Sequence, residues 1–148
     1  MSKRIFSIIV LILTLFIYGF NIMNDDKTTD YNFNNPSLAH TLPAILHEIS
    51  GITYLNSTSI ACVQDEKGII IIYDFVNGKI IRQFSFGEDG DYEGIAKVGN
   101  KLYVLRSDGT LFEISEYESN NYKVKTYPTD IPAEDNEGLC YDEQNKRL

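Results

Sequence analysis

The chain has 148 residues and a formal net charge of −8 at pH 7, and it contains no Trp, 10 Tyr and 8 Phe. The acidic balance argues against a nucleic-acid partner, because phosphate binding needs a basic surface. It suits cation binding, or simply solubility. The abundance of Tyr and Phe favours a β domain over a helical bundle.

The chain begins with a basic and then apolar segment. Lys3 and Arg4 precede an uncharged stretch over residues 5–23. Cleaved signals have an apolar run of roughly 7 to 15 residues, whereas a membrane-spanning helix needs about 20. We therefore predict an apolar helix over residues 1–23 that is a signal peptide or, as its length favours, a transmembrane anchor. The amino-terminal charges keep the start in the cytoplasm, so the rest should lie outside it, in the periplasm or at the cell surface, beside the plasma membrane.

After the apolar segment, residues 24–41 are rich in Asn, Asp and Thr and show no hydrophobic period. This composition predicts a linker. Beyond it an acid-rich phrase ending in Gly and then Ile or Leu occurs three times, with its glycines at Gly51, Gly94 and Gly138. Their spacing of about 43 residues is typical of four-stranded propeller blades, which bury their faces by stacking on one another.

Within residues 42–148, short apolar segments alternate with turn residues such as Asn, Gly and Asp. The intervals are too short for the crossover helices of a parallel sheet, so we predict antiparallel meanders. The fold class is then all-β, a partial β-propeller of four-stranded antiparallel blades. The predicted strands are Gly51–Tyr54, Ser59–Gln64, Ile69–Asp74 and Lys79–Phe86 in the first unit, and Gly94–Val98, Lys101–Ser107, Thr110–Tyr117 and Tyr122–Tyr127 in the second.

The segment Ile69–Tyr73 has four successive isoleucines. A strand with one wet face would alternate apolar and polar residues, so this run should be covered on both sides, as blade stacking would do. The third unit starts at Asp135 and provides only one strand and a turn. Because closed propellers use about four to eight blades, we expect this chain to be a fragment of about two and a half blades with an exposed edge.

Cys62 and Cys140 stand at different offsets from their repeat glycines. A disulfide needs Cα atoms within about 7 Å, and the first and third units are not neighbours in a stack. We therefore expect two small buried apolar residues rather than a bridge.

The acids concentrate in particular links of the predicted meanders. In an up-and-down unit, the link into strand one and the link between strands two and three lie at the same end. Because strand one of a blade lines the central channel, these acids would surround its mouth. Ca²⁺ takes several carboxylate and carbonyl oxygens, so we predict a site for calcium or another divalent cation. Its candidate ligands are Glu48, Asp65, Glu66, Asp91, Glu93, Asp135 and Glu137.

Two other interpretations of these acids stay open. Turns favour Asp for backbone reasons, and Glu ahead of Gly could only solvate the end of the sheets. A carboxyl group with a raised pKa could also serve catalysis. Other catalytic signals are weak, because His40 and His47 cannot assemble a zinc site and the serines lack a nucleophile elbow. No catalytic residue is predicted, and the pattern favours a binding module over an enzyme.

Several separated motifs resemble the SdiA-regulated (YjiK/CarP-like) family. They begin at Leu42, Gln64, Gly90, Leu102 and Asn136, and the resemblance covers about residues 42–148. It implies a bacterial, envelope-associated β-propeller linked to calcium response, without an established catalytic activity. It also implies that Glu48, Asp65, Glu66, Asp91, Glu93 and Glu137 are channel ligands. The expected function is a sensing or binding module of the cell envelope, and the alternative is a calcium-dependent propeller hydrolase, phytase-like or a lactonase.

Overall fold

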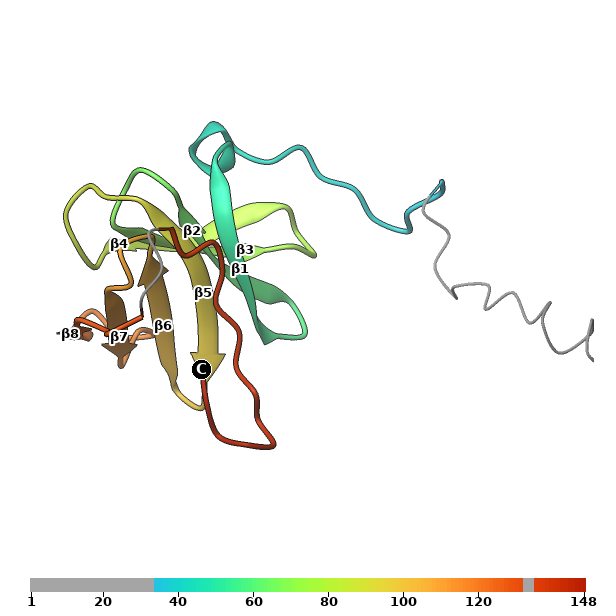
Figure 1. Ribbon diagram of the computed structural model, residues 1–148. Coiled ribbons are helices and arrows are strands. Elements are labelled where there is room, and N and C mark those ends of the chain that lie inside the picture. Colours follow the sequence, from blue (N-terminus) through green and yellow to red (C-terminus); the bar gives the residue numbers. More distant parts are fainter. Residues whose placement is uncertain (1–33, 132–134) are drawn as a thin grey trace, which may run out of the picture. The chain divides into compact units, whose positions relative to one another are not determined.

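The computed structural model describes residues 34–131 and 135–148, and residues 40–148 form one compact unit (Figure 1). The apolar helix predicted over residues 1–23 lies outside the described residues. Within the two described ranges, no helix is long and apolar enough to cross a membrane. The helical content of that part of the chain is one 3₁₀ turn, η1 (Ala44–Leu46).

Eight strands build two four-stranded antiparallel sheets, each in the order of the sequence. All eight strands predicted in the first two units are present, with ends that differ by a few residues, so the all-β prediction is confirmed. Sheet 1 contains β1 (Ile49–Asn56), β2 (Ser59–Gln64), β3 (Ile69–Asp74) and β4 (Lys79–Ser85). Sheet 2 contains β5 (Tyr92–Val98), β6 (Lys101–Arg106), β7 (Leu111–Ser115) and β8 (Lys123–Tyr127).

Short polar side chains form the hairpin turns. Asn56 Oδ1 accepts hydrogen bonds from the backbone N–H groups of Thr58 at 3.0 Å and Ser59 at 3.1 Å, which turns β1 into β2. Asp74 does the same after β3, and Gly78 completes that turn with a φ of 67°. Such a positive φ strains residues that carry a Cβ. These local bonds fix the register on which the facing side chains depend.

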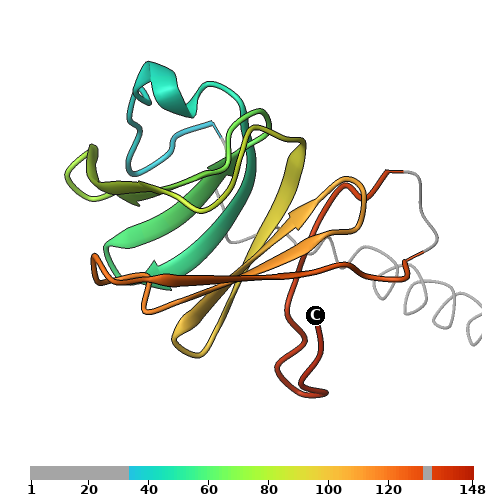
Figure 2. The same cartoon turned by 90° about the vertical axis from the view of Figure 1, so that its left-hand side faces the viewer.

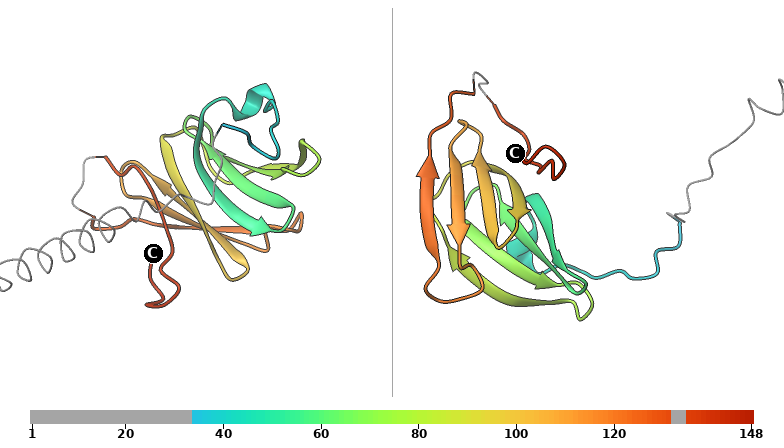
Figure 3. Two further views of the ribbon diagram at one scale, coloured as in Figure 1. Left: turned by 90° about the vertical axis from the view of Figure 1, so that its right-hand side faces the viewer. Right: turned by 90° about the horizontal axis from the view of Figure 1, so that it is seen from below.

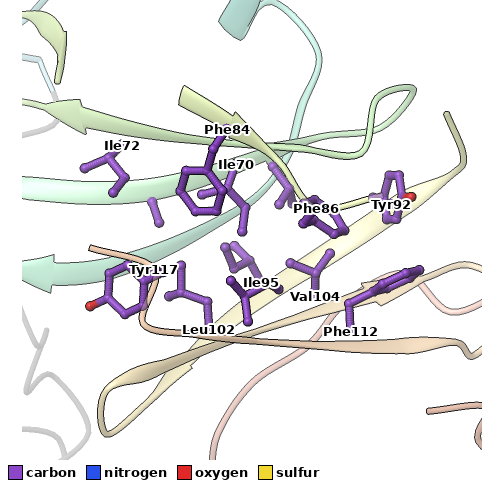
Figure 4. Packing of buried hydrophobic residues seen from close by; sticks show 13 residues of the cluster. Ile70, Ile72, Phe84, Phe86, Tyr92, Ile95, Leu102, Val104, Phe112 and Tyr117 are labelled. Atoms are coloured by element: carbon purple, nitrogen blue, oxygen red, sulfur yellow. The ribbon is translucent and has the colours of Figure 1, made fainter. Parts of the chain in front are cut away.

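The two sheets pack face to face, and their facing sides form the main core (Figures 2 and 3). Ile70 and Ile72 enter it from sheet 1, and Leu102 and Val104 enter it from sheet 2 (Figure 4). Fully burying each side chain of this size stabilises the fold by about 1.5–3 kcal/mol. At the end near the β4–β5 link, the rings of Phe86, Tyr92 and Phe112 pack edge to face, with centroids 4.9 to 5.6 Å apart.

The isoleucine run in β3 is buried on both faces, as predicted, but a different part of the protein packs against each face. Ile70 and Ile72 face sheet 2, whereas Ile71 and Tyr73 face a second cluster that includes Leu46 of η1. The expectation that stacked blades supply both covers is therefore wrong for the outer face of sheet 1. A short segment before β1 lies there instead, because the apolar Ile45 and Leu46 can fill the space beside Cys62.

The first strands of successive repeats lie against each other at their glycines. A Cβ on Gly51 would stand 2.9 Å from the backbone nitrogen of Ile95 and 3.0 Å from the Cα of Gly94. A Cβ on Gly94 would stand 2.5 Å from the backbone nitrogen of Leu139. These positions lack a side chain because backbone of the next repeat occupies the space.

Two expectations for the end of the chain need correction. Residues 135–141 run alongside β5 without forming the predicted strand, and a turn follows that is closed by a bridge between Asp142 and Arg147. A strand needs a ladder of backbone hydrogen bonds, and residues 135–141 pair with no strand. Cys62 is buried and Cys140 is exposed, and the two are free thiols. The absence of a disulfide agrees with the prediction, whereas the burial of Cys140 was wrongly expected.

Candidate metal centre

Backbone hydrogen bonds bring the acidic links together at one end of the two sheets, which we call the acidic end. Asp65 and Glu66 follow β2, and Asp91 precedes β5. The N–H of Tyr92 donates to the carbonyl of Asp65 at 2.8 Å, and the N–H of Gly90 donates to that of Glu66 at 2.9 Å. The link before β5 is therefore fastened to the β2–β3 link, which is the placement that up-and-down connectivity requires.

The same contact recurs one repeat later. The N–H of Asn136 donates to the carbonyl of Ser107, which follows β6, at 3.1 Å. The side-chain amide of Asn136 donates to the same oxygen at 2.8 Å. Ser107 in turn donates its N–H to the carbonyl of Asp91 at 2.8 Å. Asp91 and Asp135 thus enter the same end of the sheets from successive repeats.

Four of the predicted ligands interact electrostatically in this arrangement, namely Asp91, Glu93, Asp135 and Glu137. Glu93 is half-buried on β5, and its pKa is raised to about 7. Loss of hydration is the largest cause, followed by a hydrogen bond shared with Asp91 and by repulsion from that carboxylate and the two of the next repeat. The pKa of the exposed Glu137 is also raised, chiefly by repulsion from Asp135. Uncompensated negative charge therefore accumulates at this end.

The other three predicted ligands accept hydrogen bonds from backbone N–H groups, and Asp65 does so through its side chain as well. Glu48 accepts the N–H of Asp65 at 3.2 Å, and Asp65 Oδ1 accepts the N–H of Glu66 at 2.8 Å. Their carboxylates are not among the principal influences on Glu93 or Glu137. The fold therefore places all seven acids on links or strand ends of the repeats, but couples four of them.

The oxygen atoms at this end are of the kind that bind calcium, but the side chains that carry them are not positioned around one point. Carboxylate and carbonyl oxygens are the ligands that Ca²⁺ takes. In the part of the chain that the structure describes, however, no three His, Cys, Asp or Glu side chains are grouped closely enough to hold an ion. Asp91, Asp135 and Glu137 are exposed, so their side chains are not held in place by packing.

Two residues outside the predicted ligand set also shape this end, and no signal in the sequence indicated their contacts. Asn136 holds the third repeat in place, and its position two before the repeat glycine is occupied by Tyr92 in the second repeat. Arg106 donates to both carboxylate oxygens of Asp108, at 3.1 and 2.7 Å, and its guanidinium lies 5.7 Å from the centroid of the Phe112 ring. This pairing holds the pKa of Asp108 well below its usual range, and it engages the one arginine near the acidic end within residues 34–131 and 135–148.

A family model described as SdiA-regulated matches residues 26–148. The chain belongs to the SdiA-regulated family. This confirms the resemblance carried by the separated motifs, and the match includes both sheets and the segment with Asp135 and Glu137. No curated protein matches the chain.

The raised pKa of Glu93 predicts a pH-dependent stability in this SdiA-regulated chain. The unfolded chain releases the proton near the ordinary pKa of 4.5, whereas the folded chain keeps it up to about pH 7. Stability should therefore fall as pH rises across that interval. Glu93→Gln should remove this fall and stabilise the protein at about pH 8 by about 1 kcal/mol, since partial exposure screens the repulsion.

The measurement is thermal unfolding of the full chain in non-ionic detergent with a chelator, at several pH values between about 4.5 and about 8. Glu88→Gln is the matched control, because Glu88 is an exposed acid in the link just before β5. Parallel pH profiles for the wild type and Glu93→Gln would contradict the assignment.

Proposed function

We propose that this chain is part of a β-propeller of the bacterial cell envelope, and that its acidic end binds a divalent cation, calcium first. The observation that carries the proposal is the mutual repulsion of Asp91, Glu93, Asp135 and Glu137, which come from two successive repeats. Like charges held together by a fold cost free energy that a bound cation would relieve. Acidic turn residues whose only role is to keep the end of the sheets solvated could instead extend away from one another into water.

The propeller arrangement is supported by the way the repeats stack. Sheet 1 and sheet 2 are separate four-stranded meanders, and their first strands approach at Gly51 and Gly94. The segment after Gly138 lies on β5 as β5 lies on β1. A third sheet continued from that segment would extend the same stack, with the acid-bearing links on one side. This arrangement would surround a channel mouth with carboxylates.

The candidate ligands fall into two sets on this proposal. Asp91, Glu93, Asp135 and Glu137 would hold the cation, and the neighbouring Glu48, Asp65 and Glu66 would add charge and, through the links, carbonyl oxygens. The cation would neutralise charge and connect successive repeats. The basic start of the chain and the apolar segment over residues 5–23 support a site outside the cytoplasm, as the positive-inside rule would require for a membrane anchor. A sensing module that responds to external calcium is consistent with these features.

The alternative is a calcium-dependent hydrolase, in which a bound metal activates water. The pKa of Glu93, raised to about 7, would suit a general acid or base. A phosphate substrate would need free cations near the metal; Arg106 is engaged by Asp108, which leaves Lys67 of the β2–β3 link. The binding module is therefore the better-supported function.

Calcium titration by calorimetry on the full chain tests the proposal. We expect saturable binding in the range of about 10⁻⁴–10⁻³ M that is typical of extracellular calcium modules. Glu93→Gln and Glu137→Gln should each weaken it about tenfold, which corresponds to about 1.4 kcal/mol. Glu118→Gln is the control, because Glu118 is an exposed acid in the β7–β8 link, at the other end of sheet 2. Identical heats for all variants would remove the cation site, and calcium-dependent hydrolysis of a phosphate monoester or a lactone would favour the alternative.

A further inference from the structure

The turn between β3 and β4 contains Asn77 followed by Gly78, which is the one place in the sequence where Gly follows Asn. Asn77 is exposed to solvent in this turn. The backbone nitrogen of the residue after an Asn can attack the side-chain carbonyl carbon of that Asn, and a Cβ on the attacking residue hinders its approach. Because Gly has no Cβ, this pair offers the least hindered attack in the chain.

The fold requires Gly at position 78, so this position cannot supply the hindrance that would protect Asn77. Gly78 has a φ of 67°, which strains residues that carry a Cβ. A Cβ built on it would also stand 2.8 Å from Nδ1 and 3.1 Å from Cε1 of His40, which lies a few residues before η1. A side chain here would have to displace His40 from the turn. The reactive pair is therefore a consequence of how the β3–β4 turn is built.

The side chain of Asn77 is bound to a carboxylate. Its amide nitrogen donates to Oδ2 of Asp74 at 2.7 Å, and its backbone N–H donates to Oδ1 of the same residue at 2.8 Å. The N–H of Val76 donates to that Oδ1 as well, at 3.0 Å. Asp74 is the last residue of β3 and pairs with Lys79, the first residue of β4. Any negative charge introduced at position 77 would therefore lie against the carboxylate that holds the end of the hairpin together.

From this turn we infer that Asn77 is a site of spontaneous deamidation in the folded chain, and that the product loosens the β3–β4 turn. The nitrogen of Gly78 attacks Cγ of Asn77 and gives up its proton to solvent. The side-chain nitrogen leaves as ammonia, and a cyclic imide forms. Water then opens the imide at one of its two carbonyl carbons, which leaves aspartate or isoaspartate at position 77. One water is consumed and one ammonia released, and no oxidant or reductant takes part.

Both products disturb the turn, each for its own reason. Aspartate replaces the amide that donates to Asp74 with a second carboxylate, so a hydrogen bond becomes a repulsion between like charges. Isoaspartate also carries the backbone through the side-chain carbon, which lengthens the chain between Asp74 and Lys79 by one methylene. Their pairing fixes the register at this end of the hairpin. Because His40 lies against Gly78, the segment before β1 should loosen together with the turn.

The test incubates the full chain in non-ionic detergent at mildly alkaline pH, with circular dichroism to show that it stays folded. Peptide mapping by mass spectrometry then measures the conversion of each Asn to aspartate and isoaspartate. Asn77 should react first, and several times faster than Asn56. Asn56 is the matched internal control, because it is also an exposed turn residue whose side chain bonds the backbone, but Ser57 follows it. Asn77→Gln should abolish the reaction at this position, since the larger ring that Gln would form closes far more slowly.

Hydrogen exchange tests the consequence separately. Asn77→Asp carries the charge of one product from the start, so the backbone N–H groups at positions 76 and 77 should exchange several times faster than in the wild type and in Asn77→Gln. Exchange within sheet 2 should not change. An Asn77 that stays intact while Asn56 reacts, or that reacts only once urea unfolds the chain, would overturn the site. Equal exchange in Asn77→Asp and the wild type would overturn the loosening of the turn.

Discussion

Tyr92→Ala should destabilise the folded chain by about 4 kcal/mol, the range observed when a large buried aromatic side chain is truncated. Tyr92 is completely buried, and its ring packs against Phe86 at 4.9 Å and against Phe112 at 5.6 Å between centroids. Its hydroxyl donates to the carbonyl of Glu88 at 2.7 Å. The truncation would leave a cavity between the sheets and a carbonyl without its donor. Since small domains have stabilities of about 5–15 kcal/mol, much of the folded population would be lost.

Tyr92→Phe separates the two contributions. It keeps the ring and removes the hydroxyl, so it should cost about 1 kcal/mol, the usual net value of one hydrogen bond. Urea unfolding followed by circular dichroism measures both variants. Because the hydroxyl holds the link that carries Asp91, Tyr92→Phe should also loosen the acidic end. Equal costs for the two variants would mean that the ring contributes no packing.

Gly68→Ala should destabilise the chain by about 3 kcal/mol, at the upper end of the range for overpacking. Gly68 is buried in the β2–β3 link, and a Cβ on it would stand 2.4 Å from the carbonyl oxygen of Gly87 and 2.5 Å from that of Glu88. These neighbours are backbone atoms, which cannot rotate away as a side chain could. Relief would require breaking the bond from the N–H of Phe86 to the carbonyl of Gly68, 2.8 Å long.

The adjacent Lys67→Ala is the control for Gly68→Ala, because Lys67 is exposed in the same link. It should change the free energy of unfolding by less than about 0.5 kcal/mol. Urea midpoints at matched slopes provide the comparison. A Gly68→Ala chain as stable as Lys67→Ala would show that the two links can separate without cost, and the acidic end would then lack a fixed frame.

The strands could be predicted from the sequence because their signals are local. The run from Ile69 to Tyr73 demanded two apolar environments, and Asn56 and Asp74 ended strands with side chains that bond the turn backbone. The segment that packs on the outer face of sheet 1 could not be predicted. Leu46 contacts Cys62 and Tyr73 from a segment with no period, and only the packed structure shows which apolar residue fills a given space.

The candidate site was predicted in part for a similar reason. Up-and-down connectivity placed the acidic links at one end of the sheets, but it gave no distances between side chains. The coupling of Glu93 to Asp135 and Glu137 depends on how closely Leu139 approaches Gly94, which is a property of tertiary packing. The exposure of Cys140 depends on the same packing, because its segment lies on β5 with one side open.

Arg82 on β4 fastens the two sheets far from the acidic end. Its guanidinium donates to the backbone carbonyls of Glu118, at 2.7 Å, and Ser119 in the β7–β8 link, while Tyr122 donates to the carbonyl of Ser85 at 2.6 Å. The sheets are thus joined at their outer margin by these bonds and at their inner margin by the glycines. A sheet held at both margins cannot pivot about either one. If the proposed cation site exists, its affinity should therefore respond to a substitution of Arg82 at the molecule's periphery, because the spacing of the carboxylates on the inner strands depends on how the two sheets are held.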